Sequence, residues 1–389
     1  MRARLFVVFA AVLVAAALPF SAAAEGAPGD DDVADELKRQ TDELELDGWD
    51  EYLDRIASLV DPSAASMKEI VLRLSEEGGL SGPGAVVEMG GKVLREEAKR
   101  TAAAAAALAA AALVTSFAGL VSDEGMKRLL STLLLTAAVT LTAGMYLDFA
   151  KTAADSVGEA ERIAEKAAPV MSALLVSLGA ESSAGLFRPL MVFLSDSVIA
   201  VIEKAELPLV LAGGVFAIVD ALTDGAALSK TVRLIARLSK WLLGLVSVFY
   251  FGMTAVQGLT VATRDGVSLR TAKYAIDKLV PVVGGMVSGT VDSVMGCALL
   301  VKNGVGLAVI LILLAVLFRP LVKLAAGIFV FRLAAAISEP AADPRAARLF
   351  SNAAEMTEHL FACAAVTGTM LALTVLVFIA SGGVTAGLW

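Results

Sequence analysis

The stretch TAAAAAALAAAALVTSFAGLVS, residues 101–122, contains no charged residue and is long enough to cross a membrane as a single helix. An α-helix rises about 1.5 Å per residue, so about 20 apolar residues span the hydrocarbon core of a bilayer. Further charge-free runs of similar length follow at residues 129–147, 241–263 and 360–389. These runs predict an all-α polytopic membrane protein.

The composition of the 389 residues agrees with this class. Hydrophobic residues make up 57% of the chain and charged residues only 19%, and the mean hydropathy is +0.76. The apolar residues form long blocks, whereas in a soluble protein they recur at the period of a helix or strand. Ala and Gly are frequent, which suits closely packed transmembrane helices.

The first 24 residues have the features of a secretory signal peptide. Arg2 and Arg4 precede an apolar core, and Ala22 and Ala24 provide small residues for cleavage before Glu25. The alternative is an uncleaved first anchor. With either, we expect the next segment to lie outside the cytoplasm.

That segment, residues 25–100, carries 20 acidic and 9 basic residues, a net charge of −11. Such acidity argues against nucleic acid as a partner. Two parts of the segment repeat apolar residues at helical spacing, so we expect a small exported helical segment before the membrane part.

Basic clusters orient the membrane part, because positively charged loops prefer the cytoplasm. With residues 25–100 outside, two transmembrane helices in residues 101–150 place the first cluster inside. After each span that ends outside the cytoplasm, the chain must then cross the membrane an odd number of times before it reaches the next basic cluster. The clusters contain Lys127, Arg128, Lys230, Arg233, Arg237, Lys240, Arg345 and Arg348.

The remainder has signs of an internal duplication. The pentapeptide LFRPL occurs at residues 186–190 and 317–321, but little else matches at that offset. An offset of about 112 residues aligns EKAAPV with DKLVPV, and Pro208-Leu209-Val210 with Pro320-Leu321-Val322. We predict two parallel repeats, residues 151–262 and 263–389. Each would hold three short or broken helices, a basic loop and one long span, which makes four crossings per repeat.

Charges and prolines inside apolar blocks are candidates for function. A charge in the bilayer is costly unless it is paired or hydrated, so such residues can line a water-filled path or a subunit interface. The alternative for Lys302, Arg319 and Lys323 is that they lie near helix ends and snorkel. Paired prolines can break helices at a transport site, and the alternative for Pro208 is an ordinary helix start. The candidates are Asp196, Asp292, Lys302, Pro169, Pro208, Pro281 and Pro320.

The segment TRDGVSLRTAKYAIDKLVPVVGG, residues 263–285, predicts a turn at Asp265 and Gly266 followed by an amphipathic helix on the extracytoplasmic surface. Arg270 and Lys273 are three residues apart and share a face of that helix, so we expect a basic surface for partner subunits. The acidic exported segment is another possible occupant of this surface.

Catalytic, metal and cofactor motifs are missing from the sequence. It has one histidine, His359, and two cysteines in apolar stretches, Cys297 and Cys363, and it lacks a phosphate-binding loop and a nucleophile elbow. We predict no enzyme activity and no cofactor.

The sequence in and around residues 263–285 resembles the stage III sporulation protein AE family. The resemblance is carried by VQGLTVATRDGVSLRTAKYAIDKLVPVVGG and DSVMGCALLVKNGVG, and specifically by Gln257, Gly258, Asp265, Gly266, Leu269, Arg270, Thr271, Ala272, Lys273, Tyr274, Pro281, Val282, Asp292, Leu299, Leu300, Lys302, Asn303, Val305 and Gly306. It implies a multi-pass subunit of the channel complex between mother cell and forespore, located in the mother-cell membrane around the forespore. The implied partners are the other channel subunits and the lipid bilayer, with self-association as an open alternative. A different class, suggested by the repeat, is an autonomous secondary transporter.

Overall fold

The computed structural model describes residues 31–60, 64–77, 83–118, 123–178, 193–223, 228–279, 284–339 and 344–381, together with the single residues 185 and 189. All regular secondary structure in these ranges is helical. The predicted signal peptide, residues 1–24, lies outside the described residues.

Short helices come first in the chain. They are α2 (Asp31–Asp42), the 3-10 helix η1 (Asp47–Tyr52), α3 (Leu53–Val60) and α4 (Met67–Glu77). Trp49, Tyr52, Ile56 and Ile70 are buried and belong to the same hydrophobic core as the long helices. The exported helical segment predicted from the apolar spacing is therefore helical where it is described.

Long helices form the rest of the molecule. They are α5 (Pro83–Ala118), α6 (Glu124–Ser177), α8 (Leu207–Leu222), α9 (Ser229–Leu279), α10 (Gly284–Ser338) and α11 (Pro344–Ala380), with the π-helical segments η2 (Phe193–Ile199) and η3 (Ile202–Glu206) leading into α8. Ala, the best helix former, dominates the second half of α5. The side chain of Asp123 caps α6 by accepting a hydrogen bond from the Gly125 N–H group at 2.9 Å.

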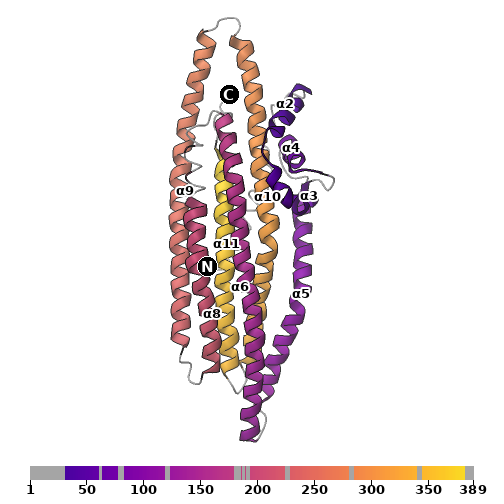
Figure 1. Cartoon of the computed structure of the whole chain (residues 1–389), viewed down its shortest axis with the longest axis vertical. Helices are drawn as coiled ribbons and strands as arrows, with labels where there is room; N and C mark the ends of the chain where they lie inside the picture. Colours follow the sequence, from indigo (N-terminus) through magenta and orange to yellow (C-terminus); the bar gives the residue numbers. More distant parts are fainter. Residues whose placement is uncertain are drawn as a thin grey trace.

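The long helices lie side by side in an elongated bundle (Figure 1). Helices α6, α9 and α11 run in one direction, and α5, α8 and α10 run in the other. Consequently the starts of α6, α9 and α11, which carry the three basic clusters, lie at the same end of the bundle. The sequence prediction that these clusters share one side agrees with this arrangement, and α2 to α4 lie toward the opposite end.

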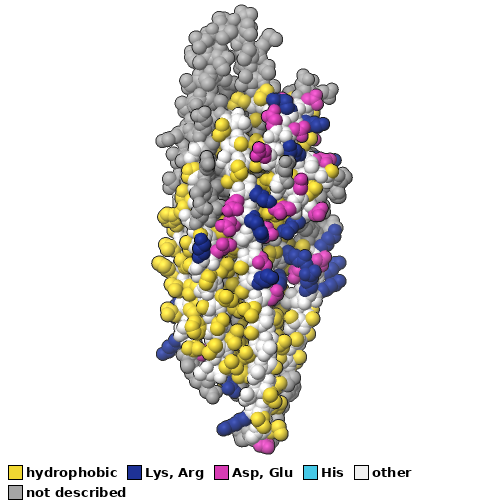
Figure 2. Space-filling view, in the orientation of Figure 1, with side chains coloured by type: hydrophobic (Ala, Val, Ile, Leu, Met, Phe, Trp, Pro, Cys, Tyr) yellow, Lys and Arg dark blue, Asp and Glu magenta, His cyan; other side chains and the backbone are white. Residues whose placement is uncertain are grey.

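Within the part of the chain that the structure describes, five helical segments are long and apolar enough to span a membrane, namely Gly125–Ser177, Ser197–Leu222, Ser229–Ala255, Val294–Ser338 and Pro344–Ala380. Exposed hydrophobic side chains cover the lower part of the bundle, whereas charged side chains gather over α2 to α5 and the adjacent part of α6 (Figure 2). The chain is an all-α membrane protein with a polar portion that continues beyond its apolar surface.

Helices α10 and α11 form the centre of the bundle. The most apolar window of each is 72% buried within the protein, compared with 22% for α6 and 28% for α9. Hydroxyl groups on α11 are satisfied inside their own helix, because Thr357, Thr367 and Thr374 donate to the carbonyl oxygens four residues earlier. Such internal bonds let polar residues lie in an apolar interior.

Helix α8 approaches its neighbours closely through two glycines. A Cβ atom on Gly214 would lie 2.1 Å from the Tyr146 ring of α6, and one on Gly213 would lie 2.5 Å from the Met356 sulfur of α11. The Tyr146 hydroxyl also donates to the Val210 carbonyl oxygen at 2.7 Å. The small residues therefore allow a helix contact that any larger side chain would prevent.

The prediction of short or broken helices is wrong for α6 and α10, whereas η2, η3 and α8 of the first repeat are short, with 7, 5 and 16 residues. Pro169 lies inside α6 and Pro320 inside α10, helices of 54 and 55 residues. Proline removes one backbone hydrogen bond and clashes locally, but neighbouring helices can hold such a helix together. One continuous α10 thus replaces the separate segments and the four crossings expected in the second repeat. The hairpins α8–α9 and α10–α11 run in the same direction (Figure 1), while the duplication itself stays a prediction.

Candidate functional site: the cleft between α5, α6 and α10

A cleft of 470 Å³ opens between α5, α6 and α10, with Arg55 of α3 at one end. Its charged lining residues are Arg55, Glu97, Arg100, Asp148, Asp155, Glu159, Arg319 and Lys323. Apolar residues, including Met145, Phe149 and Val316, line the remainder. The cleft therefore combines four cations and four carboxylates on largely apolar walls.

Arg319 of α10 pairs with Glu97 of α5. Its Nε atom donates to Glu97 Oε1 at 2.8 Å, and the Glu97 side chain is only 3% exposed while that of Arg319 is 45% exposed. The Arg100 guanidinium lies 3.9 Å from the same carboxylate. Arg319 therefore neutralises a buried acid and holds α5 against the middle of α10 instead of snorkelling toward a helix end.

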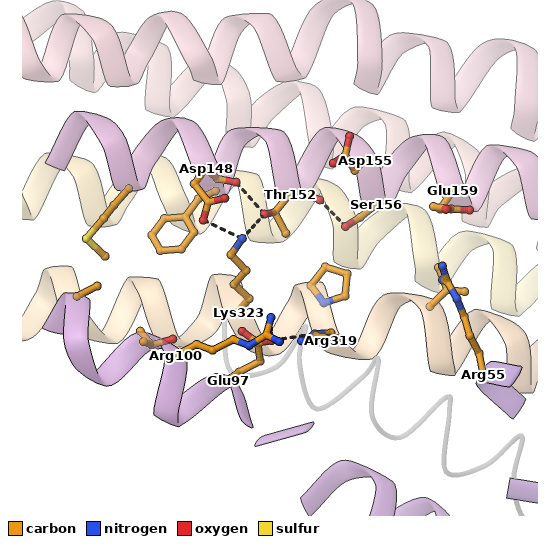
Figure 3. Close-up of a pocket in the computed structure, with 16 residues that line it drawn as sticks. Arg55, Glu97, Arg100, Asp148, Thr152, Asp155, Ser156, Glu159, Arg319 and Lys323 are labelled. Atoms are coloured by element: carbon orange, nitrogen blue, oxygen red, sulfur yellow. Dashed lines mark hydrogen bonds and ion pairs between the residues drawn. The ribbon is translucent and has the colours of Figure 1, made fainter. Parts of the chain in front are cut away.

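Lys323 of α10 reaches the opposite wall. Its Nζ atom lies 2.8 Å from Asp148 Oδ2 and 2.9 Å from Thr152 Oγ1, both on α6 (Figure 3). One α10 turn with Pro320 between these two cations thus connects α5 on one side with α6 on the other. Snorkelling is again not the explanation, because the ammonium group ends on protein acceptors.

The charges of the cleft are balanced, so the cleft is better suited to holding the three helices in position than to binding one strongly charged ligand. Within the described residues, no group of three or more His, Cys, Asp or Glu side chains could hold a metal ion. On α6 the charge-free residues 129–147 end directly before Asp148, and eight charged residues follow over positions 148–166. The cleft therefore lies where the apolar part of α6 passes into its polar part.

Lys302, a predicted site residue, has a different role from the snorkelling considered above. It is fully buried, and its Nζ donates to the carbonyl oxygens of Ile379 at 2.8 Å and of Ser381. These carbonyls lie at the C-terminal end of α11, where backbone oxygens lack helical partners and a cation is favoured. Lys302 thus connects α10 to the end of α11.

Two glycines beside Lys302 complete this junction. A Cβ atom on Gly304 would lie 2.2 Å from Ser75 Oγ and 2.8 Å from the Val71 carbonyl oxygen of α4, and one on Gly306 would lie 2.4 Å from Ile379. The stretch Lys302–Gly306 therefore brings together α4 of the N-terminal segment, α10 and α11. Next to Lys302, the Oδ1 atom of Asn303 is buried with no hydrogen-bond partner among the described residues.

The other predicted residues are scattered. Pro208 lies in the first turn of α8, which matches the alternative of a helix start. Asp196 lies in η2 and Asp292 in α10, but their side chains, like Pro281 as a whole, lie outside the described residues.

The predicted turn at Asp265 and Gly266 is wrong, because α9 continues through both residues to Leu279. A Gly inside a helix costs only about 1 kcal/mol relative to Ala, which the flanking helix formers offset. Arg270 and Lys273 are therefore part of α9, and their side chains lie outside the described residues.

Sequence reasoning missed the carboxylate partners, Glu97 and Asp148. Asp148 directly follows the charge-free run 129–147 and Glu97 lies four residues before the run that starts at Thr101, so closeness to such a run is a usable signal. It also missed Glu206 and His359, which border the apolar blocks 207–219 and 360–380.

The bundle, its apolar surface and its paired internal charges define a polytopic helical membrane protein with a projecting polar part. The family model described as stage III sporulation protein AE matches residues 85–382, so the chain belongs to that family. It is also 30% identical over 217 residues to the stage III sporulation protein AE of Bacillus subtilis (strain 168). That alignment covers 56% of this chain and 54% of the relative. No solved structure matches the chain.

Proposed function

We propose that the chain is a non-catalytic membrane subunit of the channel complex between mother cell and forespore, and that it acts in endospore formation. Family membership supports the role in sporulation. Membership of a channel complex, with the other channel subunits as partners, is the finer part of the proposal.

The length of the helices is the observation that carries it. Helix α6 has 54 residues and α10 has 55. At about 1.5 Å per residue each is about 80 Å long, compared with about 30 Å for the hydrocarbon core. More than half of each helix therefore projects from the membrane or lies in its interfaces. A projecting surface of this size provides contact area for other protein subunits.

The same helices weaken the alternative of an autonomous secondary transporter. That class builds a midplane site from helices interrupted at corresponding positions of two repeats. Here α10 is continuous through Lys302 and Pro320, and α6 is continuous through Pro169. The interruption that suggested a transport site is therefore missing from these helices.

The proposed orientation follows from the basic clusters. The end of the bundle with the starts of α6, α9 and α11 faces the mother-cell cytoplasm, because basic residues prefer that side. The N-terminal segment and the far end of α9, which holds Arg270 and Lys273, then face the space between the two membranes, where partner subunits can bind.

Co-purification from sporulating cells tests the proposal. We expect the full chain to retain the other channel subunits, and Arg270→Glu with Lys273→Glu to reduce their recovery while membrane insertion is unchanged. The matched control is Arg270→Lys with Lys273→Arg, which keeps both charges. Solute uptake by the purified chain alone in lipid vesicles, with no partner retained in cells, would instead establish the transporter.

A further inference from the structure

Three polar side chains meet inside the bundle, away from the cleft. Glu206 ends η3 at the start of α8, Ser239 belongs to α9 and His359 to α11. The Ser239 hydroxyl donates to Glu206 Oε1, and its Oγ lies 3.1 Å from His359 Nδ1. The exposed fractions are 0% for Glu206 and Ser239 and 4% for His359. One hydroxyl group thus connects a carboxyl group to an imidazole.

Glu206 has too few partners for a permanently charged carboxylate. Its Oε2 atom is buried with no hydrogen-bond partner in the described part of the chain, and no salt bridge to Lys or Arg is found for it there. A buried carboxylate is very costly unless it is paired or it takes up a proton. The Glu206 carboxylate therefore requires a cation that reaches it inside the bundle and neutralises its charge.

The chemistry of the three groups selects a proton as this companion. Metal cations of the Ca²⁺ type need about six or more oxygen ligands, and this site supplies one carboxyl and one hydroxyl group. A carboxyl, a hydroxyl and an imidazole, in contrast, can each both donate and accept a hydrogen bond in one of their protonation states.

We propose that Glu206, Ser239 and His359 form a proton relay site within the helical bundle. In one state the carboxyl O–H of Glu206 donates to Ser239 Oγ, whose own hydroxyl donates to Nδ1 of neutral His359. In the other, the Glu206 proton has moved to Ser239 Oγ as the Ser239 proton moved to His359 Nδ1. The second state is a carboxylate and an imidazolium with the serine unchanged, so protons and charge balance.

Chain neighbours of the site form a partly exposed ion pair. Lys240, adjacent to Ser239, pairs at 3.3 Å with Glu355, one helical turn before His359, and both are partly exposed. Toward the interior the nearby titratable groups are Cys363 of α11 and Tyr146 of α6, both buried. In this proposal, protons reach the site from the side of the Lys240–Glu355 pair, where α9 and α11 begin.

The single histidine of the chain makes the test direct. The full chain, purified through a tag without histidine and placed in lipid nanodiscs, is labelled with ¹⁵N-histidine. Every imidazole signal then belongs to His359, and the ¹⁵N shifts distinguish neutral from protonated rings and show whether Nδ1 is hydrogen-bonded. Spectra are recorded between about pH 5 and 8, the range in which imidazole is poised to change charge.

We expect a hydrogen-bonded Nδ1 in the wild type and a severalfold loss of the protonated ring in Glu206→Gln, because a neutral amide cannot become the carboxylate that compensates the imidazolium charge. Ser239→Ala interrupts the chain of hydrogen bonds but keeps the carboxyl group, and it should give the same loss. It replaces Glu206→Gln as the test variant if Glu206→Gln does not fold. Glu203→Gln, one turn earlier, is the matched control and should leave the spectrum unchanged. A wild-type Nδ1 without a hydrogen bond, or spectra that Glu206→Gln and Ser239→Ala do not alter, would overturn the proposal.

Discussion

The ammonium group of Lys302 lies 2.8 Å from the carbonyl oxygen of Ile379, so a buried cation in the middle of one helix closes the end of another. Lys302 also lies with its Nζ 5.6 Å from the centre of the Phe378 ring. This relationship explains why a lysine can occupy an otherwise apolar stretch of α10. Its charge is compensated by the backbone oxygens and the dipole of α11.

Removal of this cation should loosen the end of α11. In Lys302→Met the side chain keeps a similar length, but the carbonyl oxygens of Ile379 and Ser381 lose their donor. Hydrogen bonds to charged groups contribute about 1.5–3 kcal/mol, and we expect the free energy of unfolding to fall by that amount. Unfolding by denaturant in detergent measures the change. Lys151→Met, which alters an exposed lysine of α6, is the control, and an equal effect of both variants would contradict the role of Lys302.

Gly304→Ala should separate the N-terminal segment from α10. The new Cβ would lie 2.8 Å from the backbone carbonyl oxygen of Val71, which cannot rotate away. We expect faster proteolysis of residues 31–77 with little change in the membrane part. Gly296→Ala is the matched control in the same helix, because no atom lies within 4 Å of its Cβ position. Equal cleavage rates in the two variants would show that α4 does not depend on this contact.

The Arg319–Glu97 pair should stabilise the contact between α5 and α10. Breaking a fully buried pair costs about 3–5 kcal/mol. Arg319 is 45% exposed, so solvent screens the pair and we expect Arg319→Met to cost about 1–3 kcal/mol. The charge-exchanged variant Arg319→Glu with Glu97→Arg should recover part of the loss. A double-mutant cycle of unfolding free energies measures the coupling, and a coupling of zero would show that the pair is incidental.

Acid should release the N-terminal segment from α6. Lys166 donates to Glu51 and, at 2.6 Å, to the Gly48 carbonyl oxygen, and its hydrogen bond holds the pKa of Glu51 below the usual value. Because the pKa of Glu51 is lower in the folded than in the unfolded state, its ion pair stabilises the folded state at pH values above the unfolded-state pKa. This stabilisation is lost as the pH falls through the folded-state pKa. We therefore expect loosening below about pH 4, the ordinary range of Glu.

The emission of Trp49 measures this release, because its side chain is 4% exposed in the docked segment. The other tryptophans, Trp241 and Trp389, are replaced by Phe. Lys166→Met should remove the acid-dependent step. Glu36→Gln, which affects a pair within α2 only, should keep it, and an unchanged step in Lys166→Met would assign the effect to other groups.

Reporter fusions test the orientation of the bundle. A reporter that is active only in the cytoplasm should work when it is inserted within residues 224–227 or 340–343, and it should be silent when it is fused after Trp389. The reason is that the basic starts of α9 and α11 share one end of the bundle and α11 runs away from it (Figure 1). Activity of the fusion after Trp389 would contradict the proposed sidedness.

Three of the long spans predicted from the sequence, at residues 129–147, 241–263 and 360–389, overlap candidate membrane helices of the structure, because their signal is local. A charge-free run of about 20 residues satisfies its backbone within one helix, so its length and composition are sufficient. The basic starts of α6, α9 and α11 likewise required no knowledge of packing. The same local reasoning failed at Pro169, Pro320 and the Asp265-Gly266 pair, where helix-breaking residues are carried inside long helices.

What the sequence determined by itself is the class of protein, its family and the relative placement of its basic ends, since each depends on residues that are adjacent in the chain. Only the tertiary structure decided which polar groups that are distant in the sequence meet. Lys302 and Ile379 are 77 residues apart and Arg319 and Glu97 are 222 residues apart. Such pairs form because a buried charge must find a partner wherever packing brings one within reach, and no periodicity in the sequence records that distance.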